Sequence, residues 1–149
     1  MEEHIYTVDL HWKADRKGEI SSPELNEKIE VATPPEFPKG IAGIWSPEHL
    51  YTAAVNSCFM TTFLAIAENF GLQFKSLTCP AKGRLSKQDG RFVMSQIVLE
   101  PVLCIYNAED KEKAEKILFK AEKACLITNS IKAEVILVPE IKLAESLVS

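Results

Sequence analysis

Four cysteines are the residues of this chain best suited to covalent chemistry: Cys58, Cys79, Cys104 and Cys125. A thiolate can attack an electrophile, bind a metal or form a disulfide. The sequence has no Cys-x-x-Cys pair of the kind found at zinc sites, and its cysteines are too few and too widely spaced for a disulfide-stapled secreted domain. Because a free cysteine is most often a small buried hydrophobic residue, we assign Cys79 and Cys104 to that class.

Unlike the other cysteines, Cys58 lies in the interior of a long predicted helix. Ser46, Pro47 and Glu48 are typical of an N-cap, a first helical position and an acidic first turn. The apolar residues that follow, as far as about Phe70, surround the helix axis almost completely, so we expect a helix that is buried on most sides. Cys58 lies ten residues after Glu48, among small residues that would leave room for a pocket.

Activation of Cys58 requires a nearby cation, because the helix dipole acts only within about one turn of the helix end. Arg16, in a predicted turn, is the candidate. Cys125 lies at the predicted end of a second helix, where partial negative charge disfavours a thiolate. It is a poor first nucleophile, but it could resolve a sulfenic acid on Cys58 by forming a disulfide. The sequence leaves open whether the two thiols touch.

The remaining pattern predicts an α+β fold in a single domain over residues 1–149, with helices packed against antiparallel sheet. Asp89-Gly90 favours a tight hairpin turn, and Pro101 implies an edge position or a bulge. A second amphipathic helix is expected from Asn107 to about Cys125. The predicted strands are Ile5 to Lys13, Glu19 to Ser22, Lys28 to Ala32, Phe74 to Leu85, Arg91 to Ile105 and Ile131 to Val138.

The charge distribution argues against several partners. The net charge is -4 and the lysines and arginines are scattered, so we expect neither a nucleic acid nor an anionic membrane as a partner. Polar residues interrupt the apolar helix, which argues against a membrane span. The acidic start lacks the features of a signal peptide, so we expect a cytoplasmic protein. The histidines, which we expect at the surface or in caps, do not have metal-ligand spacing, and we predict no metal site: His4, His11 and His49.

Residues 46–54, Ser-Pro-Glu-His-Leu-Tyr-Thr-Ala-Ala, lead to Ser-Cys-Phe at 57–59. This segment resembles the central helix of the OsmC and organic hydroperoxide resistance (Ohr) proteins. Members carry a Pro-Glu helix start, a run of alanines, a Cys-Phe step ten residues after the glutamate, and a second cysteine before the last strand. Residues 120–125, which end at Cys125, match that second site.

The resemblance implies the OsmC-like fold, with antiparallel sheets packed around a long buried helix, in an intertwined homodimer. It also implies a thiol-dependent peroxidase for organic hydroperoxides that needs no cofactor. The arginine and glutamate of the family site map onto Arg16 and Glu48, although the usual glycine pair before the arginine is absent. Peroxidase members tend to have proline after the second cysteine, where this chain has Leu126.

In the implied mechanism, Glu48 holds Arg16, and Arg16 stabilises the Cys58 thiolate that attacks the peroxide. Cys125 then forms a disulfide with Cys58, and an external dithiol, such as a lipoyl group, or a small thiol restores both. An apolar site would favour an organic hydroperoxide over hydrogen peroxide. The residues expected to line it are Trp45, Phe59, Met60 and Phe63.

Helix geometry adds a constraint on Glu48. Ten residues at ~1.5 Å rise place the backbones of Glu48 and Cys58 roughly 15 Å apart, so the two side chains cannot pair within one straight helix. Glu48 would serve the Cys58 of a second subunit, and we hypothesise an active site shared between chains.

Two further hypotheses remain open. One is a noncatalytic protein that binds an apolar ligand at the dimer interface, with Cys58 buried and inert. The other is a redox sensor in which the disulfide between Cys58 and Cys125 changes a partner interaction. Without the family resemblance, Glu48 could simply complement the helix dipole and Arg16 could be a solvated turn residue.

Overall fold

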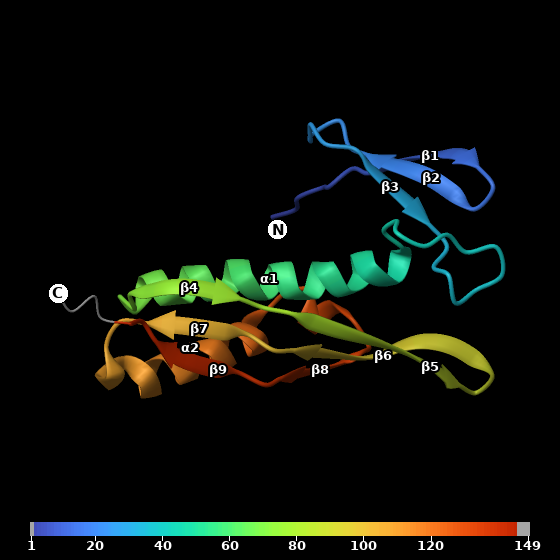
Figure 1. Cartoon of the computed structure of the whole chain (residues 1–149). Coiled ribbons are helices and arrows are strands. Elements are labelled where there is room, and N and C mark those ends of the chain that lie inside the picture. Colours follow the sequence, from blue (N-terminus) through green and yellow to red (C-terminus); the bar gives the residue numbers. More distant parts are fainter. Residues whose placement is uncertain (1, 146–149) are drawn as a thin grey trace. The chain divides into compact units, whose positions relative to one another are not determined.

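The computed structural model describes residues 2–145. The chain divides into two compact units, residues 1–50 and residues 51–149, which are described separately below. Figure 1 shows the order of the elements, with three strands before a long helix and six strands and a second helix after it. The prediction of one domain over residues 1–149 stays a prediction.

The N-terminal unit contains an antiparallel sheet in the order β1-β2-β3. Its strands are β1 (Asp9–Ala14), β2 (Lys17–Ser21) and β3 (Ile29–Ala32). The three strands predicted here are thus confirmed, but the first begins at Asp9 and not at Ile5. Its alternation predicts a half-buried strand with Leu10 and Trp12 on one face. That prediction was wrong, because Leu10 is 71% exposed and Trp12 73%.

Helix α1 (Pro47–Asn69) begins and ends where its sequence predicts. The Ser46 hydroxyl accepts a hydrogen bond from the backbone N–H of His49 at 3.1 Å, as an N-cap should. At the other end Gly71 takes a positive φ of 66°, and the N–H of Leu72 donates to the carbonyl of Ala67 at 2.9 Å. This left-handed C-terminal cap stops the helix before the next strand.

The strands of the C-terminal unit form two three-stranded sheets, β4-β7-β9 and β5-β6-β8. In Figure 1 the two sheets follow one another along the unit. β4 pairs with β7, and β5 pairs with β6, in antiparallel orientation. β8 pairs with β6, and β9 pairs with β7, in parallel orientation. The strands are β4 (Phe74–Thr78), β5 (Ala81–Gln88), β6 (Arg91–Leu99), β7 (Val102–Ile105), β8 (Glu134–Leu137) and β9 (Glu140–Leu143).

Prolines divide the strands of this unit, which corrects the prediction of two uninterrupted strands from Phe74 to Leu85 and from Arg91 to Ile105. Pro80 lies between β4 and β5, Pro101 between β6 and β7, and Pro139 between β8 and β9. Proline cannot donate to a ladder, so each strand leaves its sheet at that point. The N–H of Glu140 donates to the carbonyl of Pro101 at 2.8 Å, so the strand breaks at Pro101 and Pro139 lie side by side. The strand after Pro139 was not predicted.

The hairpin between β5 and β6 turns at Asp89 and Gly90, as predicted. Both residues have positive φ, 52° and 77°, which is the signature of a type I′ turn.

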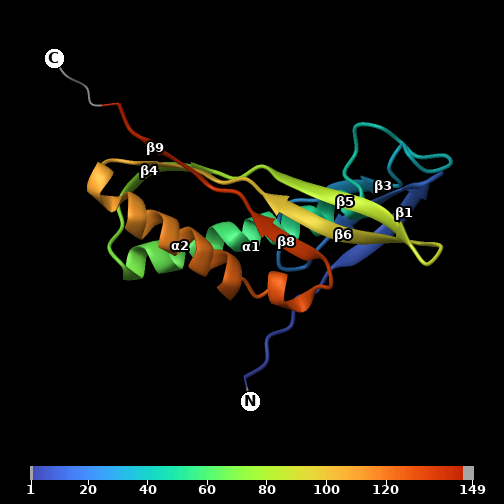
Figure 2. The ribbon, with the colours of Figure 1, turned by 90° about the horizontal axis from the view of Figure 1, so that it is seen from below.

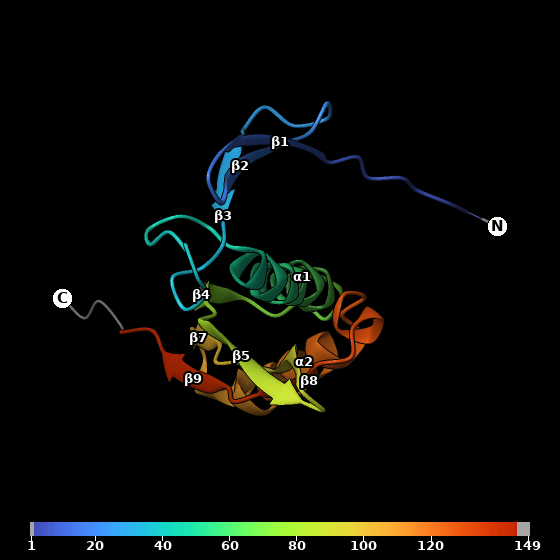
Figure 3. The ribbon, with the colours of Figure 1, turned by 90° about the vertical axis from the view of Figure 1, so that its right-hand side faces the viewer.

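Helix α2 (Lys111–Ala124) follows the 3-10 turn η1 (Ala108–Asp110) and precedes a second one, η2 (Thr128–Ser130). It connects β7 to β8, and its apolar face shares one core with α1 and the strands. Figures 2 and 3 show α1 and α2 as neighbours in this unit. The buried residues of α2 are Ala114, Ile117, Leu118 and Ala121.

Only one stripe of α1 is buried, which corrects the prediction of a helix buried on most sides. The stripe has a four-residue spacing and consists of Val55, Phe59, Phe63 and Ala67. Away from it, Met60 is 43% exposed and Leu64 42%. The length and composition of α1 would also suit a bilayer span, a test that core helices of soluble proteins pass equally well.

Two contacts fix the rotation of α1 against the strands. The side-chain amide of Asn56 donates to the carbonyl of Cys79 at 3.1 Å, where β4 ends. Gly83 in β5 faces Thr52, and a Cβ at Gly83 would overlap the Thr52 hydroxyl, so the strand needs glycine there. With this rotation fixed, the direction in which Cys58 leaves the helix is also fixed.

We predict a large loss of stability for Phe63→Ala, because Phe63 belongs to the buried core. Phe63 is 0% exposed and its ring meets that of Phe74 edge to face at 5.3 Å between centroids. Its truncation should lower the free energy of unfolding by about 3–5 kcal/mol. Phe92→Ala, which truncates a ring that is 56% exposed, is the matched control and should cost about 1 kcal/mol or less. Urea denaturation of both variants checks this, and equal losses would contradict the assigned core.

Candidate active site

The thiols of Cys58 and Cys125 meet in the C-terminal unit. Cys58 leaves the middle of α1, and Cys125 is the C-cap of α2, where the chain turns to extended geometry at φ -62° and ψ 117°. The Cys125 thiol lies within hydrogen-bonding reach of Cys58 Sγ, and both cysteines are reduced. Whether the two thiols touch, which the sequence left open, is answered by the packing of α2 beside α1.

Cys58 has further hydrogen-bond donors from two directions. Thr62 lies one turn further along α1, with its Oγ1 4.0 Å from Cys58 Sγ. The backbone amides of Leu126 and Ile127 donate from the segment that follows Cys125. Cys58 is also partly exposed, so a reagent can reach it.

These donors lower the pKa of Cys58. Burial would raise this pKa, but the hydrogen bonds from Cys125, the Ile127 amide, the Thr62 hydroxyl and the Leu126 amide outweigh it. Hydrogen bonds donated to a thiolate favour the charged form, because they replace the water that burial removes. Cys58 therefore has the character of an attacking thiolate.

The pKa of Cys125 moves the other way. Cys125 is fully buried, and burial raises its pKa. The hydrogen bond to Cys58 and the charge of Cys58 raise it further, against the opposing hydrogen bonds from Thr128. Of the two thiols, Cys58 is therefore the one that loses its proton first, and Cys125 is the one that keeps its proton longer.

Short-range hydrogen bonds hold the segment that carries these amides. The side-chain amide of Asn129 donates to the carbonyl of Lys123 at 3.0 Å, and the Ser130 hydroxyl donates to the carbonyl of Leu126 at 2.7 Å. Helix α2 thus ends in a capped turn that directs amides toward Cys58.

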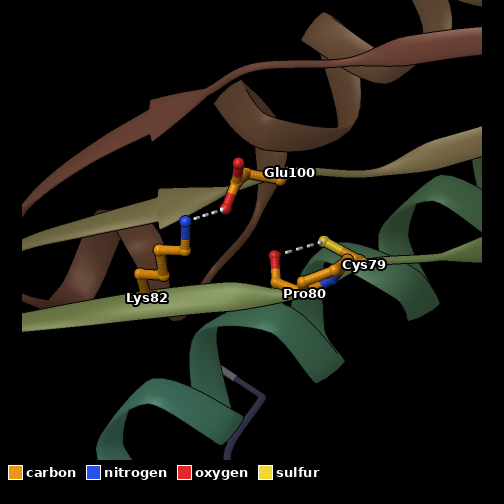
Figure 4. A network of polar contacts seen from close by, with 4 residues as sticks. All are labelled: Cys79, Pro80, Lys82 and Glu100. Atoms are coloured by element: carbon orange, nitrogen blue, oxygen red, sulfur yellow. Dashed lines mark hydrogen bonds and ion pairs between the residues drawn. The ribbon is translucent and has the colours of Figure 1, made fainter.

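The other two thiols lie apart from this pair. Cys79 directly follows β4, and burial first and the charge of Glu100 second raise its pKa to about 11. Figure 4 shows its thiol directed at the carbonyl of Pro80, 3.9 Å away, beside the ion pair of Lys82 and Glu100. Cys104 lies in β7, opposite Ser76 of β4. Both are partly buried, in keeping with the structural role expected of them.

Arg16 lies in the N-terminal unit, in the turn between β1 and β2. It is exposed and helps to line a surface groove of about 320 Å³. Its carbonyl accepts a hydrogen bond from Thr33 N–H at 3.2 Å. Its guanidinium forms no ion pair with another residue in the range 2–145. Its role in activating Cys58 stays a prediction.

Glu48 occupies the first turn of α1 and is partly buried. Because α1 is one continuous helix, the separation of roughly 15 Å between the backbones of Glu48 and Cys58 holds. The prediction that Glu48 acts at the Cys58 of a second subunit stays a prediction.

The model of the OsmC-like protein family matches residues 40–139, which include α1, α2, both cysteines and strands β4 to β8. The chain belongs to the OsmC-like family. Among curated proteins, the uncharacterized protein YmaD of Bacillus subtilis is 25% identical to this chain over 140 residues, 91% of each chain.

Solved structures of this OsmC-like fold superpose over nearly the whole chain. An OsmC-like protein of unknown function from Vibrio cholerae has a TM-score of 0.83 at 24% identity and covers 92% of this chain and 99% of its own. An organic hydroperoxide resistance protein from Legionella pneumophila has a TM-score of 0.75 at 20% identity, covering 95% and 99%. OhrB of Bacillus subtilis has a TM-score of 0.65 at 22% identity, covering 93% and 98%. At these identities the likeness establishes the α+β OsmC-like fold.

In this OsmC-like chain, the residues predicted to contact a substrate differ in their exposure to solvent. Phe59 and Phe63 are 0% exposed, so a substrate could reach them only if the core opened. Met60 is 43% exposed and Trp45, whose ring meets that of His49 edge to face, is 50% exposed. Contact of these residues with a substrate stays a prediction. Within residues 2–145 the structure has no cluster of three or more His, Cys, Asp or Glu side chains that could hold a metal ion.

Three neighbours of Cys58 in this OsmC-like chain were not predicted from the sequence: Thr62, Leu126 and Ile127. Thr62 could have been found, because residues four apart on a helix are neighbours. Leu126, which is 68% exposed, carries no such signal, because its proximity to Cys58 depends on how α2 packs.

The pKa directions predict an order of alkylation. Cys58 should react with iodoacetamide at the lowest pH, because its thiolate is stabilised, while Cys125 and Cys79 should need a higher pH. Trypsin places each cysteine on its own peptide, residues 40–75, 76–82, 92–111 and 124–132, so mass spectrometry can follow all of them at once. Earlier labelling of Cys125 than of Cys58 would reverse the assigned polarity.

Proposed function

We propose that this OsmC-like protein reduces organic hydroperoxides to alcohols, with Cys58 as the attacking thiolate and Cys125 as the resolving thiol. The main support for this proposal is the contact between two thiols whose pKa values are shifted in opposite directions. A peroxidase needs a thiolate for the first step and a protonated thiol close by for the second. Two proteins of the same fold, from Legionella pneumophila and Bacillus subtilis, are named for organic hydroperoxide resistance, which is in keeping with this reaction.

In the first step, the Cys58 thiolate attacks the terminal oxygen of the hydroperoxide. An S–O bond forms, the O–O bond breaks, and the alkoxide leaves and takes a proton from water to become the alcohol. The sulfur is oxidised to a sulfenic acid and the peroxide is reduced by two electrons.

In the second step, the sulfur of Cys125 attacks the sulfenic sulfur, and the hydroxyl leaves with the Cys125 proton as water. Because the two thiols are already neighbours, this step needs only a local change in the capped turn after α2. An external dithiol, which a lipoyl group could supply, then reduces the disulfide and is itself oxidised. We place this cycle in the cytoplasm, where thiols are kept reduced.

The proposal includes a homodimer. The exposed residues Leu10 and Trp12 of β1, and Met60 and Leu64 of α1, are apolar surface that a second copy of the chain would cover. A second copy would also supply Glu48, which the straight helix keeps away from its own Cys58. Arg16, paired with that glutamate, would stabilise the leaving alkoxide.

The substrate is an apolar hydroperoxide. Leu126 adjoins Cys58 through its backbone and leaves its side chain 68% exposed. An alkyl or aryl group bound there would gain from burial, whereas hydrogen peroxide has no such group to bury.

The proposal predicts the kinetics of three cysteine variants in stopped-flow assays with cumene hydroperoxide. Cys58→Ser should abolish reduction, because the nucleophile is lost. Cys125→Ser should still react once and then accumulate a sulfenic acid that dimedone traps, because resolution is lost. Cys104→Ser is the matched control and should turn over like the wild type. Hydrogen peroxide should react more slowly than cumene hydroperoxide in every active variant.

Turnover that survives Cys58→Ser would end the peroxidase proposal. A wild-type protein that forms the disulfide but is not turned over by any dithiol would favour the redox-sensor hypothesis, since the same pair of thiols could store the signal.

A further inference from the structure

Three hydroxyl side chains surround Cys58 on α1, and they make different hydrogen bonds. The Ser57 hydroxyl donates to the carbonyl of Ala53 at 2.6 Å, and the Thr61 hydroxyl donates to the carbonyl of Cys58 at 3.1 Å. Such bonds to the preceding turn are the usual arrangement for hydroxyl side chains within helices. Thr62 departs from it, because its hydroxyl faces the sulfur of Cys58 at 4.0 Å.

The Thr62 hydroxyl and the amides of Leu126 and Ile127 approach the same sulfur atom from different elements. Thr62 is partly buried, so its hydroxyl has limited access to water. The amides of Leu126 and Ile127 and the thiol of Cys125 also donate to the same sulfur. The Cys58 sulfur thus has donors from its own helix and from the turn after α2, all within the C-terminal unit.

The two segments that supply these donors carry no charged side chain. Helix α1 has no Asp, Glu, Lys, Arg or His from Tyr51 to Ala67, and the segment from Ala124 to Ile131 has none either. The titratable group in contact with Cys58 is Cys125. The stabilisation of a thiolate in this unit therefore depends on neutral donors, as at an oxyanion hole.

We infer that Thr62 is a catalytic residue that donates its hydroxyl hydrogen to the Cys58 thiolate and completes a neutral donor cradle with the amides of Leu126 and Ile127. The inference rests on the proposed function and deepens it. The resting thiolate is held by its own unit, and Arg16 is left to act on the departing alkoxide. Hydrogen bonds to a charged group are stronger than those between neutral groups, so the loss of one donor is measurable.

The test is the pH dependence of Cys58 alkylation in the full-length protein, followed on the tryptic peptide 40–75, which contains no other cysteine. Thr62→Val keeps the shape of the side chain and removes the donor. It should raise the midpoint of the pH profile by about half a unit to one unit, and slow alkylation below the midpoint about 3- to 10-fold. Thr62→Ser restores the donor and should return both values toward those of the wild type.

Thr61→Val is the matched control, because it removes a neighbouring hydroxyl that bonds to backbone and not to sulfur. Its pH profile should coincide with that of the wild type. The inference is overturned if Thr62→Val leaves the midpoint unchanged or if Thr61→Val shifts it equally.

Thr62→Ala serves as a second variant in case valine disturbs the helix, with circular dichroism as the check on folding. Alkylation needs no peroxide, so the two proposals can fail separately. A shifted midpoint in a protein without peroxide turnover would keep the cradle and reject the peroxidase. Turnover without a shift in either Thr62 variant would keep the peroxidase and reject the cradle.

Discussion

The contact between the thiols of Cys58 and Cys125 is the interaction on which the rest of the site depends. It joins the middle of α1 to the end of α2, and it exists because both helices bury one stripe in the same core. Small residues contribute to this packing, with Ala114 and Ala121 fully buried in α2. If α2 ended one turn earlier or later, Cys125 and the amides after it would miss Cys58.

The polarity of the pair follows from its surroundings. The sulfur of Cys58 receives hydrogen bonds from four donors, whereas Cys125 is fully buried and next to a negative partner. Each pKa unit of displacement corresponds to about 1.4 kcal/mol between the protonated and charged forms. Opposite displacements in two neighbouring thiols are what a nucleophile and a resolving thiol require. The same contact without these displacements would describe only two packed cysteines.

The sequence predicted those parts of the fold that depend on local signals. The start of α1 follows from Ser46 and Pro47, its end from Gly71, and the β5–β6 turn from Asp89 and Gly90. Burial was less predictable, because alternation in β1 marks an apolar face without saying what covers it. The sequence predicts that the last strand ends at Val138, although the chain continues beyond Pro139 as β9. The antiparallel pattern was likewise incomplete, since the parallel pairing of β8 and β9 is set by the crossover through α2.

For the site, the sequence singles out Cys58 and Cys125 and predicts their order of reaction, which stays a prediction, but it could not show that the two residues are neighbours. That depends on the path of α2. The most direct measurement is intact-mass and tryptic analysis after reaction with one equivalent of cumene hydroperoxide. The account predicts the loss of two hydrogens and a single linkage, between peptides 40–75 and 124–132. A gain of oxygen on Cys58 without that linkage, or a disulfide that includes Cys79 or Cys104, would contradict it.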